Sequence, residues 1–215
     1  MASWLQRLMP GPAGAEPTRW VVLDVETSGL DARRDRLLAI AAIALQVDWD
    51  RKRLAILPGD SFEVVLRQED AGADKANILL HGIGVQRQRQ GQPPAEALAA
   101  FAAYVGEAPL LAFHAPFDRL LIGRYVQQHL PQALANPWLD IAQLCAAAWP
   151  QVRALSLDEW MDHFGIVCAA RHEAAADTLA ECELMLRIWP RVAAECGSWK
   201  QVQRMAAGHR WIPRG

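Results

Sequence analysis

The sequence predicts an α/β domain with a mixed five-stranded sheet flanked by helices. The first third of the chain holds three apolar segments separated by turns, a pattern typical of an antiparallel meander. After Pro93-Pro94 the apolar residues change to helical spacing, and short apolar strands then alternate with helices. With 215 residues, of which 52% are hydrophobic, the chain can bury the core of one domain.

Three strands of the meander are expected over residues 20–26, 37–47 and 61–67. The first is rich in valine and apolar on both faces, so we expect it at the centre of the sheet. The breaker pair Pro58-Gly59 predicts a turn over residues 57–60, directly before the third strand.

The rest of the chain is expected to alternate helices with two short strands. Helices are expected over residues 95–105, 116–129, 155–164, 174–194 and 198–207, with one more that ends at Ala148, and strands over 110–114 and 138–141. Pro116 suits a first helical position, and Gly165 suits a helix end. We expect a tail over residues 1–18, the main domain over 19–196, and a C-terminal helix and tail over 197–215.

Charge and cysteine content restrict the class of protein. A net charge of −2 gives no global basic field of the kind that coats nucleic acid, although an enzyme that holds phosphates through metal ions does not need one. The four cysteines form no C-x-x-C pair, which is typical of reduced thiols in a cytosolic protein. No apolar run reaches the roughly 18 residues of a membrane span, and residues 1–17 lack the apolar core of a signal peptide. We therefore expect a soluble, cytoplasmic protein with no membrane partner.

Two acids interrupt the first strand near its end. Asp24 and Glu26 are two residues apart, so their side chains project from the same face of a strand. Two like charges in a buried strand need a positive partner, and carboxylate oxygens suit Mg²⁺ or Mn²⁺. For this pair taken alone, a solvated strand end is the alternative.

Acids in unusual positions occur at two further places. Asp118 stands in the first turn of the helix that follows strand 110–114, where the helix dipole alone would favour an acid. His172 precedes the long helix and Asp177 lies within it. A surface histidine and a solvated helical acid are the alternatives for these two.

Taken together, these residues resemble a known set. Asp24-x-Glu26-Thr27-x-Gly29-Leu30, then His-Ala-x-Phe117-Asp118, then His172-x-Ala174-x-x-Asp177 is similar in order and spacing to the three motifs of the DnaQ-like (DEDDh) 3′→5′ exonucleases. This family is typified by the proofreading epsilon subunit of bacterial DNA polymerase III. The resemblance covers residues 18–195. The family commonly has His-Asn where this chain has Phe113-His114, which leaves the metal-binding acid Asp118 in place.

The resemblance implies an RNase H-like fold and an active site with two divalent cations, Mg²⁺ or Mn²⁺. The ligands that it implies are Asp24, Glu26, Asp118 and Asp177, with Asp24 bridging the two ions. It implies that His172 is the general base that deprotonates the attacking water. A histidine titrates near neutral pH, which suits that role.

The resemblance also implies the substrate contacts and the reaction. Thr27 and Leu30 would hold the terminal nucleotide, His114 would replace the family's Asn, and His81, in a His81-Gly82-Ile83 segment that also looks like the family, would contact substrate. The expected reaction releases 5′-mononucleotides from a free 3′ end, with DNA favoured over RNA. Two alternative functions stay open: a ribonuclease of the same fold and a non-catalytic nucleic-acid-binding module. Whether the chain acts within a DNA polymerase complex or alone also stays open.

Basic and aromatic residues outside the motifs have two interpretations each. Arg33, Arg34 and Arg36 follow the first motif, within reach of a substrate strand, or form a plain charged turn. Lys200 and Arg204 could touch a nucleic-acid backbone, or belong to a solvated terminal helix. The nine tryptophans could stack on bases, although apolar spacing favours core packing for Trp138, Trp149, Trp160 and Trp189.

Overall fold

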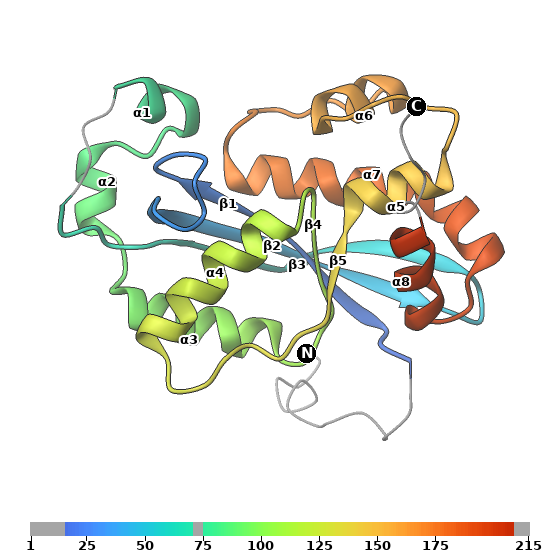
Figure 1. Cartoon of the computed structure of the whole chain (residues 1–215), viewed down its shortest axis with the longest axis horizontal. Helices are drawn as coiled ribbons and strands as arrows, with labels where there is room; N and C mark the ends of the chain where they lie inside the picture. Colours follow the sequence, from blue (N-terminus) through green and yellow to red (C-terminus); the bar gives the residue numbers. More distant parts are fainter. Residues whose placement is uncertain (1–15, 71–74, 209–215) are drawn as a thin grey trace.

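The computed structural model describes residues 16–70 and 75–208 of the 215-residue chain. Five strands form one sheet in the order β3-β2-β1-β4-β5 (Figure 1). The strands are β1 (Arg19–Thr27), β2 (Leu37–Asp48), β3 (Arg53–Val65), β4 (Leu110–Ala112) and β5 (Trp138–Asp140). β1, β2 and β3 pair antiparallel, whereas β4 pairs parallel with both β1 and β5. The predicted mixed five-stranded sheet with the first strand at its centre is therefore confirmed.

The helices of the described residues are α1 (Lys75–His81), α2 (Val85–Gln90), α3 (Pro94–Val105), α4 (Pro116–His129), α5 (Ile141–Ala148), α6 (Leu157–Phe164), α7 (Ala174–Glu195) and α8 (Trp199–Gly208). The sequence did not predict α1 and α2, which are short and lack a repeating apolar face. The helix expected from residue 155 begins two residues later. There Ser156 accepts a hydrogen bond from the backbone N–H of Glu159, and the Glu159 side chain accepts one from the backbone N–H of Ser156.

The turn expected over residues 57–60 was wrong. The chain turns at Trp49–Lys52, and β3 continues through Pro58-Gly59 with a register shift: Ala44 pairs with Leu57, and Ile43 pairs with Ser61. The three residues between bulge out of the ladder, which tolerates a proline without an N–H. Arg19 fixes the bulge through an ion pair of 2.9 Å with Asp60.

Alternate residues of β1 form two cores, one on each face of the sheet. Val21, Leu23 and Val25 pack against α3 and α4. Trp20 and Val22 pack against α5, α6, α7 and α8, so these helices cover the other face (Figure 1). Asp24 and Glu26 continue the second series, and they therefore face the side of the sheet that carries α7.

A cluster of tryptophans packs β1 and α8 together in one core. The ring of Trp20 lies 5.7 Å from Trp49, 5.6 Å from Trp189 and 4.9 Å from Trp199, measured between ring centroids. Trp160 and Trp189 are buried as expected, while Trp138 and Trp149 are half-buried. Because Trp199 belongs to this core, α8 packs with the main domain. The predicted tail over residues 1–18 lies almost wholly outside the described residues.

Two further expectations concern the cysteines and membrane-spanning helices. The four cysteines are free; Cys145, Cys182 and Cys196 are buried and Cys168 is half-buried. Among the described residues, every helix is too short or too polar to cross a membrane.

Candidate active site

The end of β1 presents two carboxyl groups toward α7. Burial, followed by the negative charge of Asp177, raises the pKa of Asp24 from its ordinary value of 3.8 to about 8. Burial and the charges of Asp24 and Asp177 raise the pKa of Glu26 from 4.5 to about 9. Charges act on each other in this way only at short range, so Asp24, Glu26 and Asp177 face one region of space.

Asp118 approaches the same region from α4, which packs on the face of the sheet opposite to α7. It lies in the first turn of α4, directly after the strand that runs parallel to β1, and only 4% of its surface is exposed. Burial raises its pKa well above the ordinary value, and the charge of Asp24 adds to this shift. The carboxyl ends of parallel strands meet at one edge of a sheet, which is why residues 94 positions apart come together here.

A fifth acid, Glu181, belongs to this cluster and was missed in the sequence. It lies one turn beyond Asp177 on α7 and is 1% exposed. Burial raises its pKa well above the ordinary value, followed by the charges of Asp24 and Asp118. Its carboxylate accepts a hydrogen bond of 3.1 Å from the backbone N–H of Phe113. The available signal was its spacing, because residues i and i+4 share one face of a helix.

Arg171 is the cation that the acids face in this structure. Its guanidinium forms an ion pair with Asp177, which is 6% exposed, and a second one of 2.6 Å with Asp158. Its positive charge lowers the pKa of Asp24 and Glu26 against the larger effect of burial. Among the described residues, no three acidic, histidine or cysteine side chains are arranged to hold a metal ion.

The residues nevertheless have the chemistry of a divalent-metal site. Their donors are carboxylate oxygens, the ligands that Mg²⁺ and Mn²⁺ prefer. Burial and mutual repulsion raise the pKa values of Asp24, Glu26 and Asp118, so a cluster without further positive charge disfavours ionisation of these three acids together. Moving Arg171 away from Asp177 would free one more carboxylate for an ion.

Comparison with known proteins identifies the family. An exonuclease family model, that of RNase T, matches residues 21–185, which is more than half of the chain. The chain belongs to the DnaQ-like exonuclease family. This confirms the resemblance drawn from the three motifs, and divalent-metal binding is typical of the family.

Curated relatives of this DnaQ-like exonuclease include subunits of bacterial DNA polymerase III. An epsilon-like protein of Rhodobacter capsulatus is 30% identical over 81% of this chain and 24% of its own length. The epsilon subunit of Aquifex aeolicus is 23% identical over 79% of each chain. A PolC-type polymerase of Clostridium perfringens is 28% identical over 77% of this chain. The chain spans only 11% of that polymerase.

Solved structures agree on the fold. Exonuclease I matches with a TM-score of 0.67 at 17% identity, over 83% of this chain and 44% of its own. The Escherichia coli exonuclease I solved in complex with a dA16 oligonucleotide matches with a TM-score of 0.66 at 18% identity, over 83% of this chain and 43% of its own. The RNase H-like fold expected from the resemblance is therefore confirmed.

The two histidines of the motifs lie in left-handed turns at the rim of the acid cluster. His114 has φ of 62° between β4 and α4, and His172 has φ of 64° before α7. Both side chains are exposed. The left-handed region favours Gly, Asn, Asp and His, so this turn accepts His114 where the resemblance leads us to expect Asn. The backbone N–H of His172 donates a hydrogen bond of 3.0 Å to Asp177, which ties the histidine turn to the acid cluster.

The loop after Glu26 is held by its own polar groups. Thr27 donates a hydrogen bond of 2.5 Å to the carbonyl of Gly29, and Ser28 donates one of 3.1 Å to Asp35. A Cβ atom on Gly29 would lie 2.6 Å from a carboxylate oxygen of Asp35, so Asp35 would have to shift to admit a side chain here. The loop presents Leu30 to solvent, 95% exposed.

His81 is placed differently from the other predicted substrate contacts. It is 3% exposed, and its Nδ1 accepts a hydrogen bond of 3.0 Å from the backbone N–H of Ile83. Its Nε2 is buried and has no hydrogen-bond partner among the described residues. Burial lowers its pKa, which favours the neutral ring. A substrate contact of His81 stays a prediction, and only Nε2 is available for it.

Proposed function

We propose that this DnaQ-like exonuclease hydrolyses the terminal phosphodiester bond at the 3′ end of DNA and releases 5′-mononucleotides in a reaction that requires divalent cations. One observation supports this most strongly: Asp24, Glu26, Asp118 and Asp177 come from three separate elements, and burial together with the charges of neighbouring acids raises the pKa values of Asp24, Glu26 and Asp118. Burying several acids together destabilises a protein, and such clusters therefore occur mainly at functional sites. The names of the relatives support DNA as the substrate class.

In this proposal the four carboxylates hold two divalent cations. When bound, the cations supply a lowered pKa for the attacking water and charge stabilisation for the phosphate oxygens. Arg171 releases Asp177 so that this acid can serve as a ligand. The ion pair of Arg171 with Asp158 keeps the guanidinium nearby when Asp177 is released.

His172 takes the proton of the attacking water in this proposal. Its exposed side chain and left-handed backbone leave the ring at the rim of the cluster, while its N–H remains bonded to Asp177. A positioned general base is typically worth about 10²–10⁴ in rate. Because His172 lies on a turn and not on a rigid β-strand, its side chain can approach the substrate after the DNA has bound.

Thr27 and Leu30 hold the terminal nucleotide. An apolar side chain as exposed as Leu30 can pack against the face of the last base, and the bonded Thr27 fixes the loop that carries it. His114 borders the same site from the turn before α4. Association with a DNA polymerase stays a prediction, motivated by the names of the Rhodobacter capsulatus and Aquifex aeolicus relatives.

The test uses single strands of DNA and RNA of one sequence, each labelled at the 5′ end, incubated with Mg²⁺ or Mn²⁺. We expect a ladder of shortening labelled DNA, loss of the ladder with a chelator, and slower cleavage of RNA. A labelled mononucleotide as the first product would show 5′→3′ polarity and contradict the proposal. Faster cleavage of RNA than of DNA would reassign the substrate to RNA.

Two variants connect the activity to the site. Asp24→Asn removes one carboxylate and should abolish the ladder of shortened DNA. The fold should be retained, which an unchanged far-ultraviolet circular dichroism spectrum would show. Asp50→Asn changes an exposed acid in the β2–β3 turn and should retain full activity. An Asp24→Asn protein as active as the unmodified chain would mean that another site, or a contaminant, cleaves the strand.

A further inference from the structure

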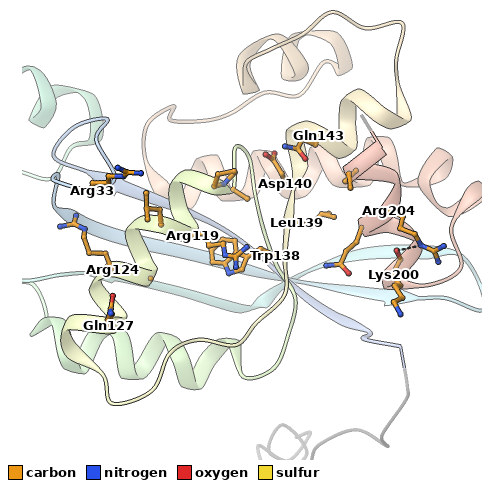
Figure 2. A pocket seen from close by; sticks show the side chains of 17 residues that line it. Arg33, Arg119, Arg124, Gln127, Trp138, Leu139, Asp140, Gln143, Lys200 and Arg204 are labelled. Atoms are coloured by element: carbon orange, nitrogen blue, oxygen red, sulfur yellow. Dashed lines mark hydrogen bonds between the residues drawn. The ribbon is translucent and has the colours of Figure 1, made fainter. Parts of the chain in front are cut away.

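A groove of about 1010 Å³ lies along the edge of the sheet formed by β5. α4 lines it from one face of the sheet, α5 and α8 line it from the other, and Trp138 and Leu139 of β5 lie between them (Figure 2). None of the predicted metal ligands lines it. The groove is therefore distinct from the acid cluster described above.

Positive charge is concentrated in this groove. Five cationic side chains line it, against one acid, Asp140; the cations are Arg33, Arg119, Arg124, Lys200 and Arg204. The whole chain carries a net charge of −2, so this concentration is local. Within residues 16–70 and 75–208, none of the five forms an ion pair with an acid. A concave surface with unpaired cations favours an anionic ligand.

Arg124 has unused donor capacity. One terminal nitrogen donates to the backbone carbonyl of Asp35, and the guanidinium lies 5.1 Å from the ring centre of Tyr125. Its Nε is buried and has no hydrogen-bond partner among the described residues. A buried donor without an acceptor is costly, and a rotation of the Arg124 side chain toward the groove would let a phosphate oxygen satisfy it.

The groove begins beside the second motif. Ala115 and Pro116, which line it, are two and three positions before Asp118. Arg33, in the loop that follows the first motif, lines it as well. From there it leads along β5 to Lys200 and Arg204 on α8 (Figure 2). A DNA strand with its 3′ end at the acid cluster could therefore continue directly into the groove.

The floor of the groove is apolar and aromatic. Trp138 is half-buried on the edge strand β5, and Leu120 of α4, 45% exposed, lines the groove as well. An aromatic ring flanked by cations is typical of sites for unpaired bases, because every base has a face that can stack. The volume is at the upper limit of small-molecule pockets, which suits a few nucleotides of single strand and is too small for a duplex.

We propose that this groove binds the single-stranded DNA that precedes the 3′-terminal nucleotide, with its phosphates against the five cations and a base on Trp138. The inference rests on the proposed function for the direction of the strand. It goes beyond that function because it assigns α8 and β5 to substrate binding. An acidic peptide has the same charge but no bases to stack, so DNA is favoured.

The test compares two groove variants with a matched control. Arg33→Ala/Arg119→Ala removes two cations near the motifs, Lys200→Ala/Arg204→Ala removes two on α8, and Arg153→Ala/Arg187→Ala removes two exposed cations that do not line the groove. Binding of a fluorescent single strand of about 20 nucleotides is measured by anisotropy in a chelator, at several salt concentrations. The chelator prevents cleavage, so binding is measured whether or not the chain is a nuclease.

We expect each groove variant to bind the strand on the order of tenfold more weakly, and the slope of log K against log salt to fall by about 1.4, or about 0.7 for each lost phosphate contact. The control should match the unmodified protein. Unchanged affinity and slope in the groove variants, or an equal loss in the control, would overturn the inference. Full displacement of the strand by polyglutamate of similar length would assign the groove to acidic peptides instead.

A second measurement separates this inference from the proposed function. The rate on a long strand is divided, for each variant, by its rate on the p-nitrophenyl ester of thymidine 5′-monophosphate, which is too small to reach α8. We expect this ratio to fall on the order of tenfold in the Lys200→Ala/Arg204→Ala protein. If the unmodified chain hydrolyses neither substrate, the proposed function fails, and the anisotropy alone decides whether the groove binds DNA.

Discussion

The backbone N–H of Phe113 donates a hydrogen bond of 3.1 Å to the carboxylate of Glu181, across 68 positions of sequence. The bond joins the end of β4, which leads to Asp118, to the first half of α7, which carries Asp177. It therefore helps to fix the separation of two predicted metal ligands on different elements. Because Glu181 is buried, removing its oxygens would leave the Phe113 N–H without a partner.

Two substitutions of Glu181 should behave differently. Glu181→Gln keeps an acceptor oxygen and should change the free energy of unfolding by less than about 1 kcal/mol. Glu181→Leu is similar in size but leaves the N–H unsatisfied, and should cost about 1–3 kcal/mol. Urea denaturation of the three proteins measures this. Equal stability of the two variants would mean that the hydrogen bond is not important for folding.

Arg171 pairs with Asp177 in this structure, so in the proposed function it should compete with metal ions for this carboxylate. Arg171→Gln removes a positive charge from the cluster, and a doubly charged ion gains more from this than a competing proton does. We expect calorimetric titration to show Mn²⁺ binding about tenfold more tightly, equivalent to about 1.4 kcal/mol. Arg187→Gln, on the exposed side of α7, serves as the control and should leave the affinity unchanged. Weaker Mn²⁺ binding in Arg171→Gln would show that Arg171 supports the site.

Without metal, the acid cluster should destabilise the protein as the pH rises. The pKa values of Asp24 and Glu26 are raised to about 8 and about 9, so the folded state binds more protons than the unfolded state above pH 4. The stability that these two groups contribute is complete below their unfolded values of 3.8 and 4.5, and is lost as the pH rises to about 9.

The double variant Asp24→Asn/Glu26→Gln isolates this effect because neutral amides do not titrate. In a chelator, its melting temperature relative to the unmodified protein should increase steadily between pH 5 and pH 9. Added Mn²⁺ should reverse the order at pH 8, since only the unmodified protein retains both carboxylates. A difference in melting temperature that is constant with pH would contradict the assignment of raised pKa values.

Gly29 should be essential for the loop that follows the first motif. Gly29→Ala places a methyl group 2.6 Å from Asp35, whose carboxylate holds Ser28 and the backbone N–H of Asp31. We expect a rise in KM on single-stranded DNA of about tenfold, because the loop positions Thr27 and Leu30. Gly59→Ala is the control; its methyl group meets nothing within 4 Å. An unchanged KM for Gly29→Ala would show that Asp35 moves aside at no cost.

Much of the fold, and the gathering of the motif acids at the end of β1, could be predicted because the signals are local. The alternation of β1 places Asp24 and Glu26 on one face, Pro116 marks the start of α4 and Gly165 marks the end of α6. The turn at Pro58-Gly59 failed for the opposite reason. Its local signal was strong, yet pairing of β3 with β2 on both sides of the bulge outweighed it.

The sequence alone determined the order of the apolar strands along the chain, the motif acids and the family, since each of these depends on residue types at fixed short spacings. Only the tertiary structure decided that Glu181 completes the cluster, that Arg171 neutralises Asp177, and that α8 forms one side of a cationic groove. These contacts depend on how whole elements pack, and the packing energy is shared among residues that are far apart in the chain.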